Sequence, residues 1–346
     1  MIKALKLFKF RSHADISLSF STGMCAIVGP NGIGKTNILE AISCATLGRS
    51  FRVETSTRDL LQENETTSRI LLGFEENGIP HRIQYTFGKQ SKEIIFDNTT
   101  YKSFSPLLGV VPVGIVCPKD VILIEGMPQS RRKYLNQMLC QASSEYAFHL
   151  KRVADIIVHK NAALKTENYT ALDPLDQMLV SSAAIIQKKR HELIQSLNTL
   201  LIPEKDALLN SNETVSLCYE PSIFQPSTST RVKEIERHCS LFGPQRDNVK
   251  IKLNDKDAFL HASEGQKRTI VLAMRFAELK ALQASTGKSP LLLIDDFGAH
   301  LDKTRSARLI ERTRKIDQCI LTAPHPPKGV DQLLDLEAYL LTSSHQ

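Results

Sequence analysis

The chain contains no tryptophan, no C-x-x-C cysteine pair and no apolar run long enough to cross a membrane. A membrane-spanning helix needs ~20 consecutive, mostly apolar residues. The seven cysteines are scattered in apolar surroundings, so neither a disulfide framework nor a zinc site is expected. The N-terminus alternates apolar and polar residues and lacks the apolar core of a signal peptide. We therefore expect a cytoplasmic protein with no membrane partner.

Other absences exclude classes of enzyme. No Asn-Lys-x-Asp motif for reading a guanine base occurs, which argues against a GTPase. The short segment after Asp296 has no acidic cluster suited to two metal ions, so a nuclease fused to the chain is discounted. No internal repeat is visible. The net charge of +7 and the pI near 9.0 suit a polyanionic partner, but charge alone only permits DNA binding.

The pattern of strands and helices predicts an α/β protein with a helical insertion. Residues 1–117 are expected to form one part of an ATPase lobe, residues 118–240 a helical lobe, and residues 241–346 the rest of the ATPase lobe. We expect a surface loop over 220–230 and a helix that follows Asp173-Pro174 and ends before Pro203. The predicted strands are Ile2–Phe10, Asp15–Phe20, Met24–Val28, His81–Phe87, Lys250–Leu253 and Pro290–Ile294, and the predicted helix near the end is Gln266–Gln283.

The segment 29–36 matches the phosphate-binding motif G-x-x-x-x-G-K-[ST]. It lies between a predicted strand and a predicted helix, as the motif requires. Glycines let the backbone curl so that N–H groups and the helix N-terminus face the phosphates. A plain glycine turn is the less probable alternative. The residues predicted to bind ATP in this element are Gly29, Asn31, Gly32, Gly34, Lys35, Thr36 and Asn37.

A second element is the apolar strand that ends in Asp295-Asp296. In P-loop proteins an acid at the tip of such a strand completes the magnesium shell, so Thr36 and Asp295 are the predicted Mg²⁺ ligands. Asp296 is the predicted catalytic residue, which activates the attacking water. On its own the pair would be an ordinary solvated strand end, and the P-loop favours the functional interpretation.

The third element is Ser263-Glu-Gly265-Gln266, which opens a predicted helix. Ser263 can simply cap this helix. The alternative is the ABC signature, in which the serine and backbone N–H groups bind the γ-phosphate held by a second protomer. Ser263, Gly265 and Gln266 are then ATP-binding residues. The order P-loop, signature and Asp-Asp strand predicts an ABC-type P-loop ATPase head with an inserted helical lobe.

The chain resembles the bacterial recombination mediator family RecF over nearly its whole length. The segments that carry the resemblance are Lys9-Phe10-Arg11-Ser12-His13, Gly48-Arg49-Ser50-Phe51-Arg52, Pro118-Lys119-Asp120 with Gly126-Met127-Pro128 and Arg131-Arg132, and Gly243-Pro244-Gln245-Arg246-Asp247. Several positions depart from the family pattern, namely Lys119, Asn136, Gln245 and the stretch Gly298-Ala299-His300-Leu301-Asp302. The last of these resembles the D-loop of a dimer interface, and its change bears on the hydrolysis rate.

The resemblance implies an ATP-dependent homodimer that binds double-stranded and gapped DNA with Mg²⁺ and ATP. It implies RecO and RecR as partners and a role in loading RecA onto single strands coated by SSB. It also implies that Arg11 stacks on adenine, against the alternative of a surface charge. The predicted DNA-binding residues come from basic clusters, although for each cluster taken singly a solvated face is the better interpretation. They are Arg49, Arg52, Arg131, Arg132, Lys188 and Lys189.

Two other functions remain open from the sequence. One is the nucleotide-binding subunit of a membrane transporter, which shares the three motifs but would not explain the long helical insertion. The other is a structural head similar to SMC proteins, in which ATP closes a clamp and hydrolysis only reopens it. His325, which follows a late apolar strand, is a candidate for the histidine that senses the γ-phosphate, although a surface histidine is the slightly better interpretation.

Overall fold

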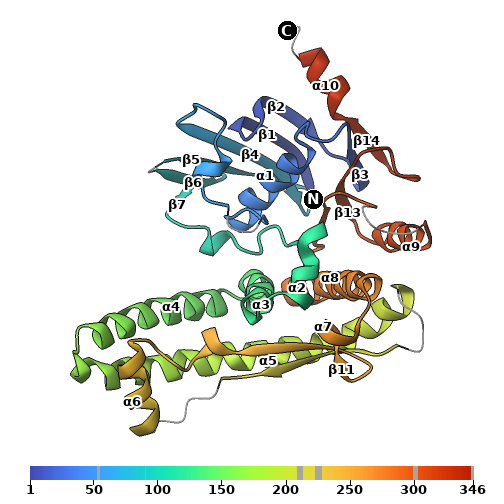
Figure 1. Cartoon of the computed structure of the whole chain (residues 1–346). Helices are drawn as coiled ribbons and strands as arrows, with labels where there is room; N and C mark the ends of the chain where they lie inside the picture. The colour runs from blue at the N-terminus through green and yellow to red at the C-terminus, as the bar shows by residue number, and fades with distance from the viewer. Residues whose placement is uncertain (53–54, 90, 209–212, 223–227, 299–302, 344–346) are drawn as a thin grey trace. The chain divides into compact units, whose positions relative to one another are not determined.

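The computed structural model describes residues 1–52, 55–89, 91–208, 213–222, 228–298 and 303–343. These residues form two compact units (Figure 1). Unit 1 combines both ends of the chain, residues 1–120 and 282–346, and unit 2 is residues 121–281. Residues 241–281, expected in the ATPase lobe, group with the helical unit, because their strand pairs with a strand of that unit. Among the described residues, no helix has the length and apolar character to span a bilayer.

Unit 1 contains a six-stranded antiparallel sheet in the order β2-β1-β4-β5-β6-β7. Alternate residues of its long strands are buried, which is the period-2 pattern of a sheet that covers a core with one face. The strands expected near the N-terminus and over 81–87 are therefore confirmed. The strand bounds are β1 Ile2–Phe10, β2 His13–Ser19, β4 Thr67–Glu76, β5 Ile79–Gly88, β6 Lys92–Phe96 and β7 Thr99–Tyr101.

The second sheet of unit 1 is parallel and has the order β14-β3-β13-β12-β8. Its central strands are almost entirely buried, as expected for a sheet covered on both faces. Figure 1 shows β3, from the start of the chain, between β13 and β14 from its end. The bounds are β3 Gly23–Val28, β8 Val113–Val116, β12 Leu291–Ile294, β13 Gln318–Ala323 and β14 Gln332–Asp335.

In the described part of unit 1, helix α1 joins the two sheets. Helix α1 contacts β13 of the parallel sheet and β1, β4 and β5 of the antiparallel sheet. Almost every residue of α1 after its first turn is buried, so this helix lies in the core between the sheets. The bounds are α1 Lys35–Leu47, α9 Lys303–Thr313 and α10 Leu336–Ser343, with 3₁₀ turns η1 Arg58–Leu60, η2 Ser105–Leu107 and η3 Pro118–Val121.

Unit 2 is mainly helical, with a small antiparallel sheet in the order β11-β10-β9. The long helices α4 and α5 pack side by side, as Figure 1 shows. The helix bounds are α2 Ile122–Glu125, α3 Pro128–Ala142, α4 Ser144–Lys165, α5 Leu172–Leu208, α6 Thr228–Arg237, α7 Ala258–His261 and α8 Glu264–Thr286, which ends just past the unit. The strands are β9 Val215–Glu220, β10 Asn248–Leu253 and β11 Lys256–Asp257, and the 3₁₀ turns are η4 Tyr169–Ala171 and η5 Pro244–Arg246.

Two local predictions in unit 2 were wrong. Helix α5 does not end before Pro203 but continues to Leu208. A proline inside a helix loses one backbone hydrogen bond, and here burial of Glu204 and Leu208 keeps the last turns packed. Within the loop expected over 220–230, Glu220 instead ends β9 and α6 begins at Thr228. Residues 223–227 of that stretch lie outside the described residues.

Candidate nucleotide-binding site

The phosphate-binding loop connects β3 to α1 in unit 1. Gly29, Gly32 and Gly34 have φ values of +146°, +84° and +105°, a region that side-chain-bearing residues rarely adopt. Gly34 also approaches the turn between β1 and β2 so closely that a Cβ atom would lie 2.6 Å from Nε2 of His13. His13 Nε2 lies 3.0 Å from the carbonyl oxygen of Gly34. The sequence therefore needs glycine here both for the backbone conformation and for this contact.

Lys35 lies at the start of α1 and turns back over the loop. Its Nζ donates to the carbonyl oxygens of Gly29 at 2.7 Å and Pro30 at 2.9 Å. Partial burial lowers the pKa of Lys35, and the carboxylates of Asp296 and Asp295 oppose that shift. The ammonium group therefore lies over the curled loop within the field of both acids.

Thr36 and Asp295, the predicted magnesium ligands, are in direct contact. The Thr36 hydroxyl donates to Oδ1 of Asp295 over 2.7 Å, which joins the start of α1 to the end of β12. A hydroxyl and a carboxylate are the hard oxygen donors that Mg²⁺ prefers, and such sites are usually completed by substrate phosphates. No cluster of three or more His, Cys, Asp or Glu that could hold a metal occurs within the described ranges. The pair therefore fits Mg²⁺ held jointly with a nucleotide.

Thr322, on the neighbouring strand β13, also contacts Asp295. Its hydroxyl donates to the same oxygen, Oδ1, over 2.9 Å. Burial raises the pKa of Asp295, while the hydrogen bonds from Thr36 and Thr322 favour the ionised form. Asp295 is thus a half-buried acid whose side chain is held by hydroxyls from α1 and β13.

Asp296 differs from its neighbour in exposure and backbone. It is exposed and has a φ of +55°, so the chain turns in the left-handed region directly after Asp295. His325 is also exposed and follows the end of β13 by two residues. Most of the stretch that resembles a D-loop, residues 299–302, lies outside the described residues.

The signature segment lies in unit 2, at the start of α8. The exposed Ser263 accepts a hydrogen bond from the amide of Gln266 at 3.3 Å, and Gln266 Oε1 accepts from the amide of Ser263 at 2.7 Å. This reciprocal arrangement is a capping box, so the structure confirms that Ser263 caps helix α8. The cap leaves Ser263 and the first turn of the helix, which includes Gly265, at the surface. A helix N-terminus of this kind can bind an anion.

Comparison with known proteins shows that the similarity is not limited to these motifs but covers most of the chain. The family model described as RecF/RecN/SMC N terminal domain matches residues 1–328. The DNA replication and repair protein RecF of Protochlamydia amoebophila is 33% identical over 340 residues, which cover 94% of each chain. The chain belongs to the RecF family.

Solved structures of that family agree with this fold. The recombination mediator protein RecF with ATP, from the RecFOR pathway, is 26% identical, covers 95% of this chain and 92% of its own, and superposes with a TM-score of 0.86. A second RecF structure, with ATPrS, is 25% identical, covers 97% of both chains and has a TM-score of 0.87. The predicted ABC-type head with an inserted helical lobe is therefore confirmed.

Two basic residues of the RecF-like motifs are tied to a buried acid of α1. Arg11 donates to both carboxylate oxygens of Glu40, at 2.8 and 3.0 Å. Arg52 lies 3.4 Å from the same carboxylate and donates to Oδ1 of Asn37 at 3.0 Å. Glu40 has no exposed surface, and a buried carboxylate needs such partners. Arg52 therefore lies beside the first turns of the P-loop helix, and the adenine contact of Arg11 stays a prediction.

The other five candidates for DNA contact divide into two groups. Arg131 donates to the carbonyl oxygens of Leu123 and Gly126, and Arg132 donates to that of Asp247, so both support unit 2 internally. Burial lowers the pKa of both guanidinium groups. Lys189 is half-buried as they are, whereas Arg49 and Lys188 are exposed. The DNA contacts of all five residues remain a prediction.

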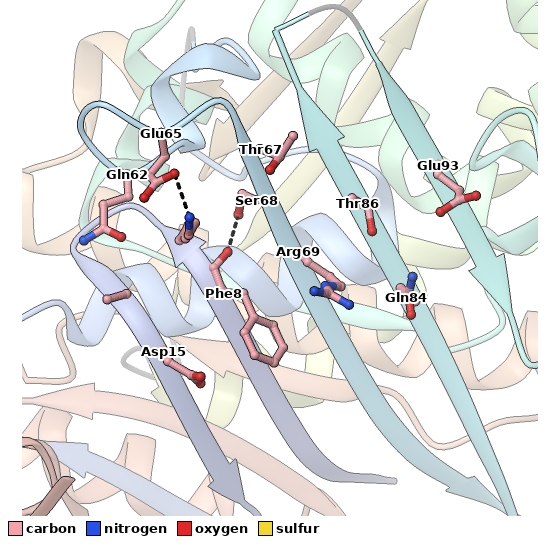
Figure 2. A pocket seen from close by; sticks show the side chains of 12 residues that line it. Phe8, Asp15, Gln62, Glu65, Thr67, Ser68, Arg69, Gln84, Thr86 and Glu93 are labelled. Atoms are coloured by element: carbon pink, nitrogen blue, oxygen red, sulfur yellow. Dashed lines mark hydrogen bonds and ion pairs between the residues drawn. The ribbon is translucent and has the colours of Figure 1, made fainter. Parts of the chain in front are cut away.

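A hollow of about 680 Å³ lies on the solvent face of the six-stranded sheet (Figure 2). The guanidinium of Arg69 lies 4.9 Å above the Phe8 ring there. Three carboxylates line the hollow against two cations, and Lys9 is already paired with Glu65 at 2.9 Å. This balance of charges makes the hollow itself an unfavourable place for a phosphate group.

Sequence reasoning missed three residues that organise these sites. Glu40 and Thr322 lie at buried positions of mainly apolar elements, where a polar residue is the signal that could have drawn attention to them. Asp247 ends a RecF-like motif, and its carboxylate accepts hydrogen bonds from Arg190 of α5 and from Tyr219 of β9. Its role in holding unit 2 together depends on those partners, which are distant in the sequence.

Proposed function

We propose that this protein is an ATP-dependent DNA-binding protein of recombinational repair and replication. ATP and Mg²⁺ bind at the P-loop, two copies of the chain close over the nucleotides, and the closed dimer holds double-stranded or gapped DNA. By relation to the RecFOR proteins, RecR and RecO are the expected partners, and loading of RecA is the expected outcome. Hydrolysis of ATP is slow and releases the DNA.

The observation that carries this proposal is the contact between Thr36 and Asp295. These residues are distant in the sequence, yet their side chains meet at 2.7 Å beside a lysine on a glycine loop. This arrangement supports binding of a nucleotide triphosphate with Mg²⁺. The bound cation neutralises charge on the β- and γ-phosphates.

The proposed dimer is supported by the surface around Ser263. Phe259 and Leu260 of the preceding helix α7 are 50% and 70% exposed, although both are large and apolar. Neighbouring apolar side chains at a surface often mark a site of protein association. The exposed start of α8 lies directly after them in the chain. A second copy that brings its nucleotide to Ser263 would cover these side chains at the same time.

Each residue has a distinct role in the proposed hydrolysis. Lys35 and the loop amides hold the β- and γ-phosphates, while Thr36 and Asp295 hold Mg²⁺. Water attacks the γ-phosphorus, its oxygen forms the new P–O bond, and the bond to the β,γ-bridging oxygen breaks to leave ADP and phosphate. Asp296, which is exposed beside the metal ligand, accepts the proton of the attacking water.

Coupling to DNA follows from the dimer. ATP favours the closed state because only two chains together offer both sets of phosphate ligands. DNA is then held by phosphate contacts from exposed cations such as Lys188, without base readout. The affinity for DNA is therefore expected to fall steeply with salt.

The test is fluorescence anisotropy of a labelled gapped duplex, titrated with protein in the presence and absence of ATP and Mg²⁺. Wild-type protein should bind at least tenfold more tightly with ATP. Lys35→Met should lose ATP binding and this enhancement. Ser263→Arg should still bind ATP as a monomer but should neither dimerise nor gain affinity for DNA. Equal, salt-sensitive binding with and without ATP would contradict the proposal, and so would normal dimerisation of Ser263→Arg.

A further inference from the structure

We infer that Thr322 is a positioning residue that sets both carboxylates of the proposed ATPase site. This inference rests on the proposed function, because it concerns the acids that would hold the metal and activate the water. Thr322 lies near the carboxyl end of β13 and is 1% exposed. Its neighbour Leu321 pairs with Ile294, the last residue of β12, so Thr322 lies alongside the point where β12 delivers its acids.

Thr322 bonds to three successive residues after β12. Its hydroxyl donates to Oδ1 of Asp295 at 2.9 Å and accepts from the amide of Asp296 at 2.8 Å. Its backbone carbonyl accepts from the amide of Phe297 at 2.7 Å. A threonine hydroxyl has one proton to donate and lone pairs to accept, so a single side chain serves the carboxylate and the next amide at once.

The two side-chain bonds have different consequences. The bond to Oδ1 adds to the one from Thr36, so hydroxyls from two different elements, α1 and β13, fix the orientation of the Asp295 carboxylate. The bond from the Asp296 amide holds a non-glycine residue at a φ of +55°, a conformation that persists only where its surroundings enforce it. The Thr322 hydroxyl therefore sets both the orientation of the Asp295 carboxylate and the direction in which the Asp296 side chain leaves the backbone.

The alternative is that Thr322 only satisfies buried polar groups and contributes stability. Thr322→Val distinguishes the positioning role from a purely stabilising role, because valine keeps the β-branched shape but removes the hydroxyl. Thr322→Ser restores a hydroxyl. Thr313→Val is the matched control: Thr313 is also 1% exposed in unit 1, but its hydroxyl donates only to the backbone carbonyl of Leu309 at 2.8 Å.

Three measurements are made on the full chain. The first is hydrogen exchange at the Asp296 amide without nucleotide, where Thr322→Val should exchange at least tenfold faster than wild type. The second is the Mg²⁺ concentration at half-maximal binding of a fluorescent ATP analogue, which should rise about tenfold because a hydrogen bond to a charged acceptor is lost. The third is single-turnover hydrolysis, which should slow by a similar factor. Thr322→Ser should recover most of each change, and Thr313→Val should alter only the melting temperature.

Two outcomes overturn the inference. One is wild-type exchange at Asp296 and an unchanged Mg²⁺ midpoint in Thr322→Val. The other is an equal change in the matched control Thr313→Val. If wild-type protein does not bind ATP with Mg²⁺, the proposed function fails, and the exchange measurement alone then decides the role of Thr322. Faster exchange in the valine variant that serine reverses would still support positioning of the Asp296 turn, and unchanged exchange would refute it.

Discussion

Replacement of Asp247 by asparagine tests the polar centre of unit 2. The Asp247 side chain is fully buried and pairs with Arg190, which is 1% exposed. It also accepts hydrogen bonds from Tyr219, from Nε2 of Gln187 at 2.9 Å and from the amide of Ser222 at 2.8 Å. These partners come from α5, β9 and the segment after β9, so one carboxylate joins elements that are distant in the sequence.

The expected cost follows from the charge that is left behind. Asparagine keeps the shape but removes the negative charge, which leaves the Arg190 guanidinium buried without its counter-charge. Removing one partner of a buried ion pair costs about 3–5 kcal/mol. Arg190 keeps its hydrogen bonds to the Pro244 carbonyl at 2.7 Å and to Asn136 at 3.0 Å. We therefore expect the loss of unfolding free energy to lie near the lower end of that range. Even about 3 kcal/mol is a large part of the ~5–15 kcal/mol by which domains are stable.

The assay is urea unfolding followed by far-ultraviolet circular dichroism, whose helical signal comes mainly from unit 2 because the longest helices lie there. Asp247→Asn, Arg190→Met and the double variant form a cycle, and the double variant should cost about 2–3 kcal/mol less than the sum of the singles. The control is Glu145→Gln, which breaks the exposed Lys189–Glu145 pair at 3.7 Å and should cost under about 1 kcal/mol. A cost below about 1 kcal/mol for Asp247→Asn, or an additive cycle, would refute the reasoning.

Three further predictions concern the site and its surroundings. Gly34→Ala should abolish ATP binding in an equilibrium titration, because its Cβ would lie 2.6 Å from His13 Nε2 at a φ of +105°, and retained affinity would contradict this. Leu260→Asp should weaken ATP-dependent dimerisation at least tenfold in analytical ultracentrifugation, whereas Val158→Asp, at a site that is 67% exposed on α4, should not. Burial lowers the pKa of His13 from 6.5, so folding favours its neutral form and the stability that it contributes is lost as pH falls below about 6.5. Melting temperatures from pH 7 to 5 should show this slope, and His13→Gln should reduce it.

The parts of the site that could be predicted from the sequence are those whose residues are adjacent in the chain. The P-loop could be identified because its glycines, Lys35 and Thr36 are adjacent and because a strand and a helix flank them. The end of β12 was predictable for the same reason, since an apolar run followed by Asp295 requires no knowledge of distant residues. Their meeting in space was expected from the motif and is observed as a hydrogen bond.

The parts that could not be predicted depend on partners far along the chain. Arg131 and Arg132 resembled a basic cluster, yet both donate to backbone carbonyls inside unit 2. Strand β9 was missed because five of its six residues are only half-buried, so it shows no period-2 pattern, and it is defined by its pairing with β10. The continuation of α5 through Pro203 likewise reflects burial of neighbouring side chains, which overrides local helix propensity.

The position of β3 in its sheet has a consequence for synthesis of the protein. This strand leads into the P-loop near the start of the chain, but its two neighbours in the sheet are β13 and β14, at Gln318–Ala323 and Gln332–Asp335. A growing chain, made at roughly 5–20 residues per second, therefore carries β3 without its sheet neighbours until β13 and β14 have been made. All of unit 2 is synthesised before that strand finds its partners. The P-loop that follows β3 should consequently gain its supporting sheet only after β13 and β14 have emerged from the ribosome.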